Sequence, residues 1–200
     1  LAMQGSGISG VDQAAVEIRL GDGGTYNLLI GATDMGTGCD TILAQMAAEC
    51  LECDLDKISV HGVDTDVSPY DTGSYASSTT YVTGGAVIKT CETLKKKMAA
   101  LAAEKLDCSI EHVEFDGSRF YSIKDEKEIS LTDLADASHF NRNDVMSASE
   151  SFTSPVSPPP FMAGIVEIEL DKETGQVEVI DYAAAVDCGT PINRNLARVQ

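Results

Sequence analysis

Alternation between apolar and polar residues predicts several short strands. Residues 14–20 and 26–30 alternate in this way on either side of a glycine-rich turn, so we expect them to form a hairpin. A second hairpin is predicted from residues 164–170 and 176–182. Shorter strands are predicted by the same pattern at 58–61, 113–115 and 120–123.

Helical periodicity appears in the stretches between these strands. Residues 41–51 carry apolar side chains with a period near 3.6, and residues 84–106 are rich in Ala, Leu, Lys and Glu. A short helix is predicted after Ser130, which has Asp133 in the third position of a capping box. Residues 193–200 are expected to begin a last helix. Residues 149–160 end in Ser-Pro-Pro-Pro and are predicted to be a connector that is not a central strand.

The order of these elements predicts an α+β fold in which hairpins and a mixed sheet pack with helices. The segments Val16-Glu-Ile-Arg-Leu20 and Val166-Glu-Ile-Glu-Leu170 each open a hairpin that leads to Asp-Met-Gly or Asp-Cys-Gly. This similarity suggests one domain over 1–200 made of two related lobes, about 1–110 and 111–200. The alternative, that such hairpins are simply common, stays open.

Composition restricts the classes of partner. The net charge is −18, with 32 acidic and 14 basic residues, which argues against binding of nucleic acid or an anionic membrane surface. No stretch is long and apolar enough to span a membrane. Six scattered cysteines are too few for a disulfide scaffold, and we expect a reducing cytoplasm. Because the chain opens on Leu1, we also expect it to be a piece of a longer protein.

Two small, polar, glycine-bearing turns precede the first two predicted helices. Their sequences are Gly31-Ala-Thr-Asp-Met-Gly-Thr-Gly-Cys-Asp-Thr41 and Asp71-Thr-Gly-Ser-Tyr-Ala-Ser-Ser-Thr-Thr80. A helix N-terminus offers unpaired N–H groups and about half a positive charge, which suits phosphates and other oxyanions. We therefore expect both turns to face one polar, anionic ligand.

Other motifs indicate competing functions. Asp71-Thr-Gly-Ser74 is the signature of aspartic proteases, which need two such carboxylates, so this reading requires a symmetric dimer centred on Asp71. A non-catalytic interaction module, in which the turns only cap helices, is the other alternative. Gly5-Ser-Gly-Ile-Ser-Gly10 has the spacing of a dinucleotide-binding loop but precedes a strand, and Cys50-Leu-Glu-Cys53 lacks two further zinc ligands.

The order of these segments resembles the second molybdenum-cofactor-binding region of the xanthine dehydrogenase and aldehyde oxidase family. The resemblance covers nearly the whole chain. The matching segments are Thr33-Asp-Met-Gly-Thr-Gly-Cys-Asp-Thr-Ile-Leu-Ala-Gln-Met-Ala-Ala-Glu49, Val63–Thr80, Gly84-Gly-Ala-Val87, Glu167–Val177, Asp187-Cys-Gly-Thr-Pro-Ile-Asn193 and Gln200.

The resemblance implies a molybdenum–molybdopterin cofactor, often the cytosine dinucleotide form in bacteria. By position, Gly36, Thr37 and Gly38 match the family's Gly-Gln-Gly turn, and Gln200 matches a cofactor-contacting glutamine. The family's second cofactor loop matches Ala76, Ser77, Ser78 and Thr79. This chain departs from the family in having Thr37 in place of glutamine and Ser78 in place of a frequent arginine.

The resemblance also implies the activity of the longer protein: hydroxylation of a purine, heteroaromatic or aldehyde substrate with water as the oxygen source. Iron–sulfur and FAD groups are expected on partner subunits or domains. Nothing in this chain matches the family's catalytic glutamate, so we expect residues 1–200 to hold part of the cofactor, to contain no catalytic or metal-ligating residue, and to be inactive alone.

Overall fold

A four-stranded sheet forms the centre of the protein in the computed structural model, which describes residues 1–142 and 144–199. Its strands lie in the order β4 (Ile58–Gly62), β3 (Tyr26–Ile30), β2 (Gln13–Leu20) and β8 (Ser147–Thr153). β2 pairs antiparallel with β3 and β8, which confirms the first predicted hairpin. β3 and β4 run parallel, and a parallel pair requires a crossover, here made by a helix.

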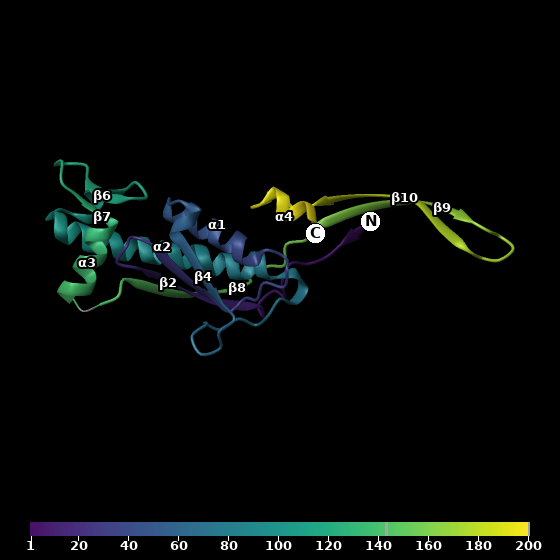
Figure 1. The fold of residues 1–200 in the computed structure, drawn as a ribbon, viewed down its shortest axis with the longest axis horizontal. Helices are drawn as coiled ribbons and strands as arrows, with labels where there is room; N and C mark the ends of the chain where they lie inside the picture. The colour runs from purple at the N-terminus through teal and green to yellow at the C-terminus, as the bar shows by residue number, and fades with distance from the viewer. Residues whose placement is uncertain (143, 200) are drawn as a thin grey trace.

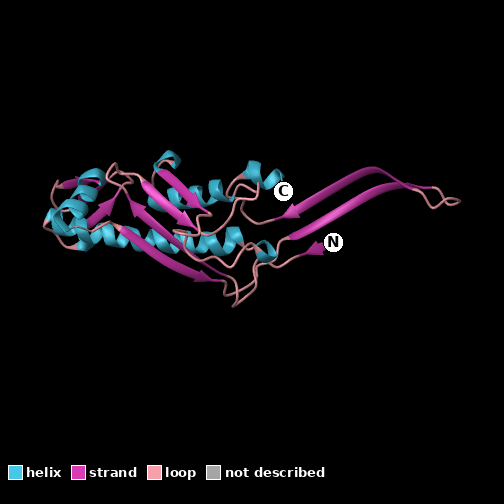
Figure 2. Ribbon diagram, turned by 60° about the horizontal axis from the view of Figure 1, so that its bottom comes forward, coloured by secondary structure: helices cyan, strands magenta, loops and turns pink. Residues whose placement is uncertain are grey.

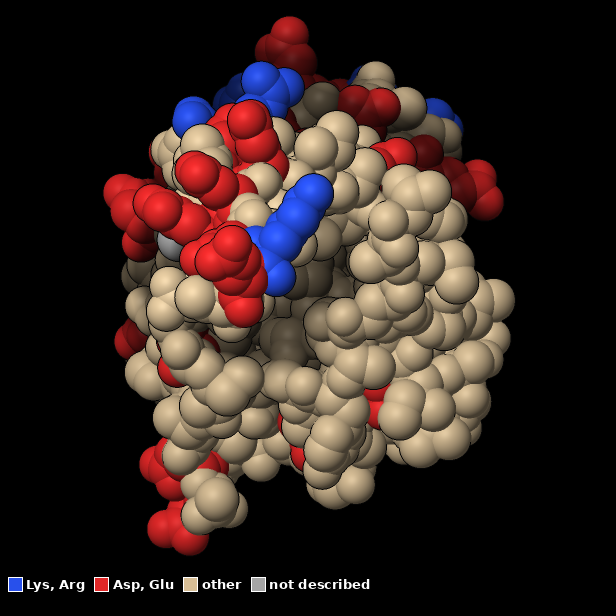
Figure 3. Space-filling view, turned by 90° about the vertical axis from the view of Figure 1, so that its right-hand side faces the viewer, with Lys and Arg blue, Asp and Glu red and all other residues tan. Residues whose placement is uncertain are grey.

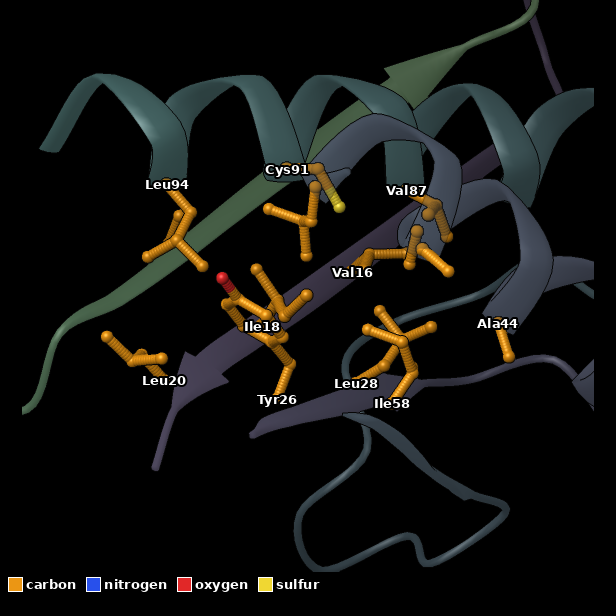
Figure 4. Close-up of a cluster of buried hydrophobic side chains, with 14 of the residues drawn as sticks. Val16, Ile18, Leu20, Tyr26, Leu28, Ala44, Ile58, Val87, Cys91 and Leu94 are labelled. Atoms are coloured by element: carbon orange, nitrogen blue, oxygen red, sulfur yellow. The ribbon is translucent and has the colours of Figure 1, made fainter. Parts of the chain in front are cut away.

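Two helices pack on this sheet and supply the other half of the core. They are α1 (Cys39–Leu51) and α2 (Thr79–Leu106) (Figure 1). Alternate residues of β2 are buried beneath them, whereas Glu17 and Arg19 between those residues are not. Figure 4 shows Val16 and Ile18 of β2 facing α2. The apolar residues whose alternation predicted the hairpin are therefore the residues that β2 contributes to the core.

Both helices begin earlier than the sequence predicted. α1 begins at Cys39 and not Thr41, and α2 begins at Thr79 and not Gly84. The first turns of α2 contain β-branched residues with modest helix propensity, but Val82 and Thr83 are buried. Tertiary packing thus extends the helix beyond its locally favoured part.

A small α+β unit lies at the far end of α2. It contains a three-stranded antiparallel sheet of β5 (Val113–Phe115), β6 (Arg119–Ser122) and β7 (Glu128–Ser130), followed by α3 (Leu131–Arg142). The prediction of Ser130 as the cap is confirmed, because its hydroxyl accepts a 3.1 Å bond from Asp133 N–H, and Asp133 answers through its side chain by accepting a bond from the same hydroxyl.

The second predicted hairpin is longer than expected and projects from the body of the protein (Figures 1 and 2). It consists of β9 (Phe161–Leu170) and β10 (Val177–Asp187), with β1 (Ala2–Met3) paired to the base of β9. The chain then ends in α4 (Arg194–Val199). Both ends of the chain lie near the base of the hairpin (Figure 1).

The expectation for residues 149–160 is wrong in its first part. β8 runs through Ser147–Thr153, and only the segment after it is a connector. The prolines begin at Pro155, beyond the paired residues, and β8 lies at the edge of the sheet. The proline-based argument excluded a central strand correctly but was applied to too many residues.

The prediction of an α+β fold is confirmed. β8 comes from the second half of the chain and pairs with β2 from the first, and the division into two lobes near residue 110 stays a prediction. All six cysteines are free thiols. Among the described residues, no helix has the length and apolar character needed to cross a membrane.

Candidate anion-binding site at two helix N-termini

α1 and α2 run parallel, so their N-termini lie at the same end of the protein. A Cβ placed on Gly84 would lie 2.6 Å from Met46 Cε. Four residues further along both helices, the Cys50 thiol lies 3.9 Å from the carbonyl oxygen of Ile88. Contacts therefore advance in the same direction along both helices.

The two N-termini are also nearly level. Met46 lies seven residues after Cys39, and Gly84 lies five residues after Thr79, which correspond to about 10 Å and about 8 Å of helix. The helix starts thus differ by about 3 Å along the axis, and packed helices lie about 8–10 Å apart. The two turns singled out in the sequence border one region.

The stems of the two turns are in direct contact. A Cβ on Gly31 would lie 2.7 Å from Cβ of Asp71 and closer still to the carbonyl oxygen of Pro69. Only glycine allows the backbone of residue 31 to pass so close to the second turn.

Asp34 organises the first turn, a role that the sequence analysis missed. Its Oδ1 accepts hydrogen bonds from Gly36 N–H at 2.8 Å and Gly38 N–H at 3.1 Å, and its Oδ2 accepts one from Asp40 N–H at 3.3 Å. These amides hold the pKa of Asp34 below its usual value. A carboxylate of the same turn therefore occupies the amides of Gly36 and Gly38, and the role of these residues as cofactor contacts stays a prediction. The side chain of Thr37 at the tip is exposed.

Ala76 and Ser77 give the second turn an unusual backbone. Their φ angles are 45° and 56°, in the left-handed region that L-residues rarely adopt. Such conformations cost about 1–2 kcal/mol per residue and cluster at ligand-binding sites. α2 follows with no side-chain cap hydrogen bond, so the first N–H groups of the helix remain available.

The predicted hydroxyl donors of this turn have different roles. Ser77 is exposed and accepts a 2.9 Å bond from Gln4 Nε2, which leaves its own O–H to donate outward. Thr79 Oγ1 lies 2.7 Å from Ser74 Oγ, so one hydrogen of this pair points elsewhere. Ser78 is buried and donates to the carbonyl oxygen of Gly73, which makes it a structural residue.

Segments from both ends of the chain complete this region. The N–H of Gly7 donates to the carbonyl oxygen of Ala76 at 2.8 Å, which places the N-terminal segment against the second turn. Leu196 of α4 lies against Gly38, where a Cβ would approach its Cδ1 to 2.6 Å. The predicted cofactor contact Gln200 lies outside the described residues. The contacts of Gly7 with Ala76 and of Leu196 with Gly38 were not predicted, because each joins positions that are far apart in the sequence and share no motif.

Neutral groups dominate the two turns, which contain no Lys or Arg. Figure 3 views the protein from the hairpin end and shows few charged side chains on its lower and right-hand sides, whereas a Lys or Arg side chain lies beside the hollow near the centre of the view. An anion here would be held by N–H and O–H donors and helix dipoles, with no counter-ion from either turn.

Asp71 has a structural role. Its Oδ1 accepts a bond from Gly73 N–H at 2.8 Å, and its Oδ2 accepts one from Thr83 Oγ1 at 3.0 Å. Both oxygens therefore fix the second turn on α2, and neither is free to act as the catalytic carboxylate of an aspartic protease.

A possible cation cluster sits at the first turn but fits poorly. Asp34, Cys39 and Asp40 place one ligand atom each within 4.8 Å of one another. However, burial and the neighbouring carboxylates raise the pKa of Cys39 to about 12, which keeps its thiol protonated. The Asp34 carboxylate already accepts hydrogen bonds from backbone amides, so its role is to stabilise the turn.

Comparison with known proteins gives one family. The family model described as "Molybdopterin cofactor-binding domain" matches residues 1–200. The chain is 32% identical over 198 residues to the probable hypoxanthine oxidase XdhD of Escherichia coli (strain K12), covering 98% of this chain and 21% of that protein. The curated relatives are much longer: the chain spans about a fifth to a quarter of their length.

Solved structures share the same fold. A Cu,Mo-CO dehydrogenase in its carbon monoxide reduced state superposes with a TM-score of 0.81 at 28% identity, covering 98% of this chain and 26% of that chain. Quinoline 2-oxidoreductase from Pseudomonas putida 86 also superposes with a TM-score of 0.81, at 19% identity over 98% of this chain and 27% of its own, and supports the fold alone.

Proposed function

The chain belongs to the molybdopterin cofactor-binding domain family, and from this we propose that residues 1–200 hold part of a molybdenum–molybdopterin cofactor within the large subunit of a molybdenum hydroxylase. The observation that carries the proposal is the pair of level, parallel helix N-termini, neither of which is capped by the side chain of its own N-cap residue. In the longer protein we expect hydroxylation of a purine, heteroaromatic or aldehyde substrate.

The donor set fits the phosphate of such a cofactor on the α2 side. A phosphate requires several converging N–H and O–H donors, and the exposed Ser77 hydroxyl adjoins the open first turn of α2. The backbone at Ala76 and Ser77 already has its strained form, and hydrogen bonds from Gly7 N–H and Gln4 Nε2 hold these two residues, so little further ordering is needed on binding.

The α1 side fits a different part of the cofactor. The carboxylate of Asp34 fills the amide nest there, so a second anion at the same place would be repelled. We propose that the turn Gly36-Thr37-Gly38 borders the uncharged pterin part, with Thr37 as its polar side chain. Gln200 is proposed as a further contact.

The bound cofactor would supply Lewis acidity and electron acceptance, whereas this chain supplies position and hydrogen bonds. None of its residues is proposed to be catalytic. We further propose that electrons pass to iron–sulfur and FAD groups on partner subunits or domains, that the enzyme works in the cytoplasm, and that the cytosine dinucleotide form of the cofactor is used.

The test is cofactor content in the full-length protein, purified from cells shown to assemble the cofactor. Ser77→Ala should lower molybdenum and phosphorus per subunit severalfold, because it removes a donor and the acceptor of Gln4. Ser59→Ala, an exposed serine on β4, is the matched control and should retain wild-type content. Absence of molybdenum from the wild-type protein would refute the proposal.

A further inference from the structure

The two faces of the β9–β10 hairpin differ sharply in character. The register pairs Val166 with Tyr182 and Ile168 with Val179, and paired residues lie on the same face. We call this side the apolar face. Its ten residues carry no charge: Met162, Gly164, Val166, Ile168, Leu170, Val177, Val179, Tyr182, Ala184 and Val186.

The opposite side, here called the acidic face, carries five carboxylates. These are Glu167, Glu169, Glu178, Asp181 and Asp187. Four of them lie towards the tip of the hairpin. The remaining paired positions of this face lie towards the base of the hairpin and are uncharged: Phe161, Ala163, Ile165, Ala183 and Ala185. The two faces therefore differ most in the outer part of the hairpin, where the acidic face suits water and the apolar face does not.

The apolar face has no cover within the described residues. Every residue of β9 and β10 is exposed. The five alternate residues on each strand are spread over nine or ten positions, which span about 30 Å, and two strands cover about 10 Å, so the face projects about 300 Å². This area is comparable to the largest apolar patch on a typical monomer, about 300–600 Å², and such a patch often has a function.

The first hairpin shows what covers the same pattern elsewhere in the chain. Val16, Ile18 and Leu20 of β2 are 0%, 0% and 5% exposed beneath α1 and α2. The equivalent residues of Val166-Glu-Ile-Glu-Leu170 are 51%, 49% and 50% exposed. Within the described residues, one copy of the pattern lies under a helical layer and the other does not.

We infer that the apolar face of the β9–β10 hairpin is covered by a helical layer from the same polypeptide outside residues 1–200. The chain spans about a fifth to a quarter of the length of its curated relatives, so a protein of their length would have ample polypeptide to provide this layer. The inference does not rest on cofactor binding, and its tests report on the hairpin alone.

The first test compares neighbouring positions on opposite faces in the full-length protein. Val179→Cys places a thiol on the apolar face and Glu178→Cys places one on the acidic face, and both positions are exposed within residues 1–200. Alkylation by a bulky maleimide, quantified at each position by peptide mass spectrometry, should be at least tenfold slower at Val179→Cys. Equal rates in a folded protein would overturn the inference.

A second test identifies what lies over the face. Tyr182, replaced by the photoreactive residue p-benzoylphenylalanine in the full-length protein, should cross-link to a peptide of the same polypeptide outside residues 1–200. The same replacement at Asp181, on the acidic face, should give little cross-linking. Cross-links from position 182 to a second copy or to another subunit would overturn the inference. So would cross-links to a non-helical segment.

Discussion

Replacing Gly31 by alanine is the sharpest test of how the two turns are held together. The added Cβ would lie 2.7 Å from Cβ of Asp71 and would also press on the carbonyl oxygen of Pro69. Restoring an ordinary contact of about 3.5 Å requires the stems to separate by about 0.8 Å. Because the obstacle includes backbone, rotation of a side chain cannot remove it.

The expected cost follows from two opposing terms. Overpacking of this kind costs about 1–3 kcal/mol, whereas a Gly→Ala change restricts the unfolded chain and returns about 0.4–1 kcal/mol. The net loss of about 1–2 kcal/mol should raise local opening about 5- to 30-fold.

Hydrogen exchange of the full-length protein, read by mass spectrometry, measures this opening directly. Peptides covering residues 31–41 and 69–80 should exchange about 5- to 30-fold faster in Gly31→Ala, and molybdenum per subunit should fall. Gly23→Ala is the control, since no atom lies within 4 Å of its added Cβ, and it should match the wild type. Wild-type exchange and molybdenum content in Gly31→Ala would refute the view that this contact holds the site.

Three further predictions concern single groups. The lowered pKa of Asp34 means that its carboxylate stabilises the first turn above about pH 4 and that this contribution is lost as the pH falls through the lowered pKa. Exchange protection of this turn should therefore fall on acidification in the wild type and change less in Asp34→Asn; identical pH profiles would contradict this. The pKa of Cys50 is lowered to about 7, mainly by a hydrogen bond from Cys91. Cys91→Ala should therefore slow the alkylation of Cys50 by iodoacetamide at pH 7 about tenfold, because less of the Cys50 thiol is ionised. An unchanged rate would exclude the hydrogen bond as the cause. Gly117 has a φ of 90°, and an added Cβ there would overlap the carbonyl oxygen of Glu52. Gly117→Ala should therefore destabilise the β5–β6 turn by about 3 kcal/mol, measured by hydrogen exchange. Wild-type protection would show that the turn rearranges freely.

Local patterns predicted most of the elements. Alternation in residues 14–20 and the cap at Ser130 depend on neighbours in sequence, and the structure confirms both. The β8 strand was missed because its residues gain their role by pairing with β2, more than a hundred residues away. Short, polar strands of this kind carry little signal of their own.

The sequence predicted that the two turns lie together, and their stems are in contact, but it did not predict their internal bonding. Small residues before a helix indicated both turns, yet the spacing did not reveal that Asp34 accepts from Gly36 and Gly38. An aspartate two residues before a glycine in a turn is a usable signal, because its carboxylate reaches the backbone two residues on. The contacts of Gln4 and Leu196 depend on tertiary structure and had no such signal.

The charge of Asp34 separates the two turns into unequal halves of one site. Two unit negative charges about 10 Å apart repel by about 0.4 kcal/mol in water and about 1.7 kcal/mol at an effective dielectric of 20, and a dianion doubles these values. Asp71 also places a carboxylate in the second turn, so what favours the first turn of α2 is that the amides of the first turn are already filled by Asp34. This polarity would orient an elongated ligand with one anionic end and one uncharged end without any basic residue in either turn, in a chain whose net charge is −18.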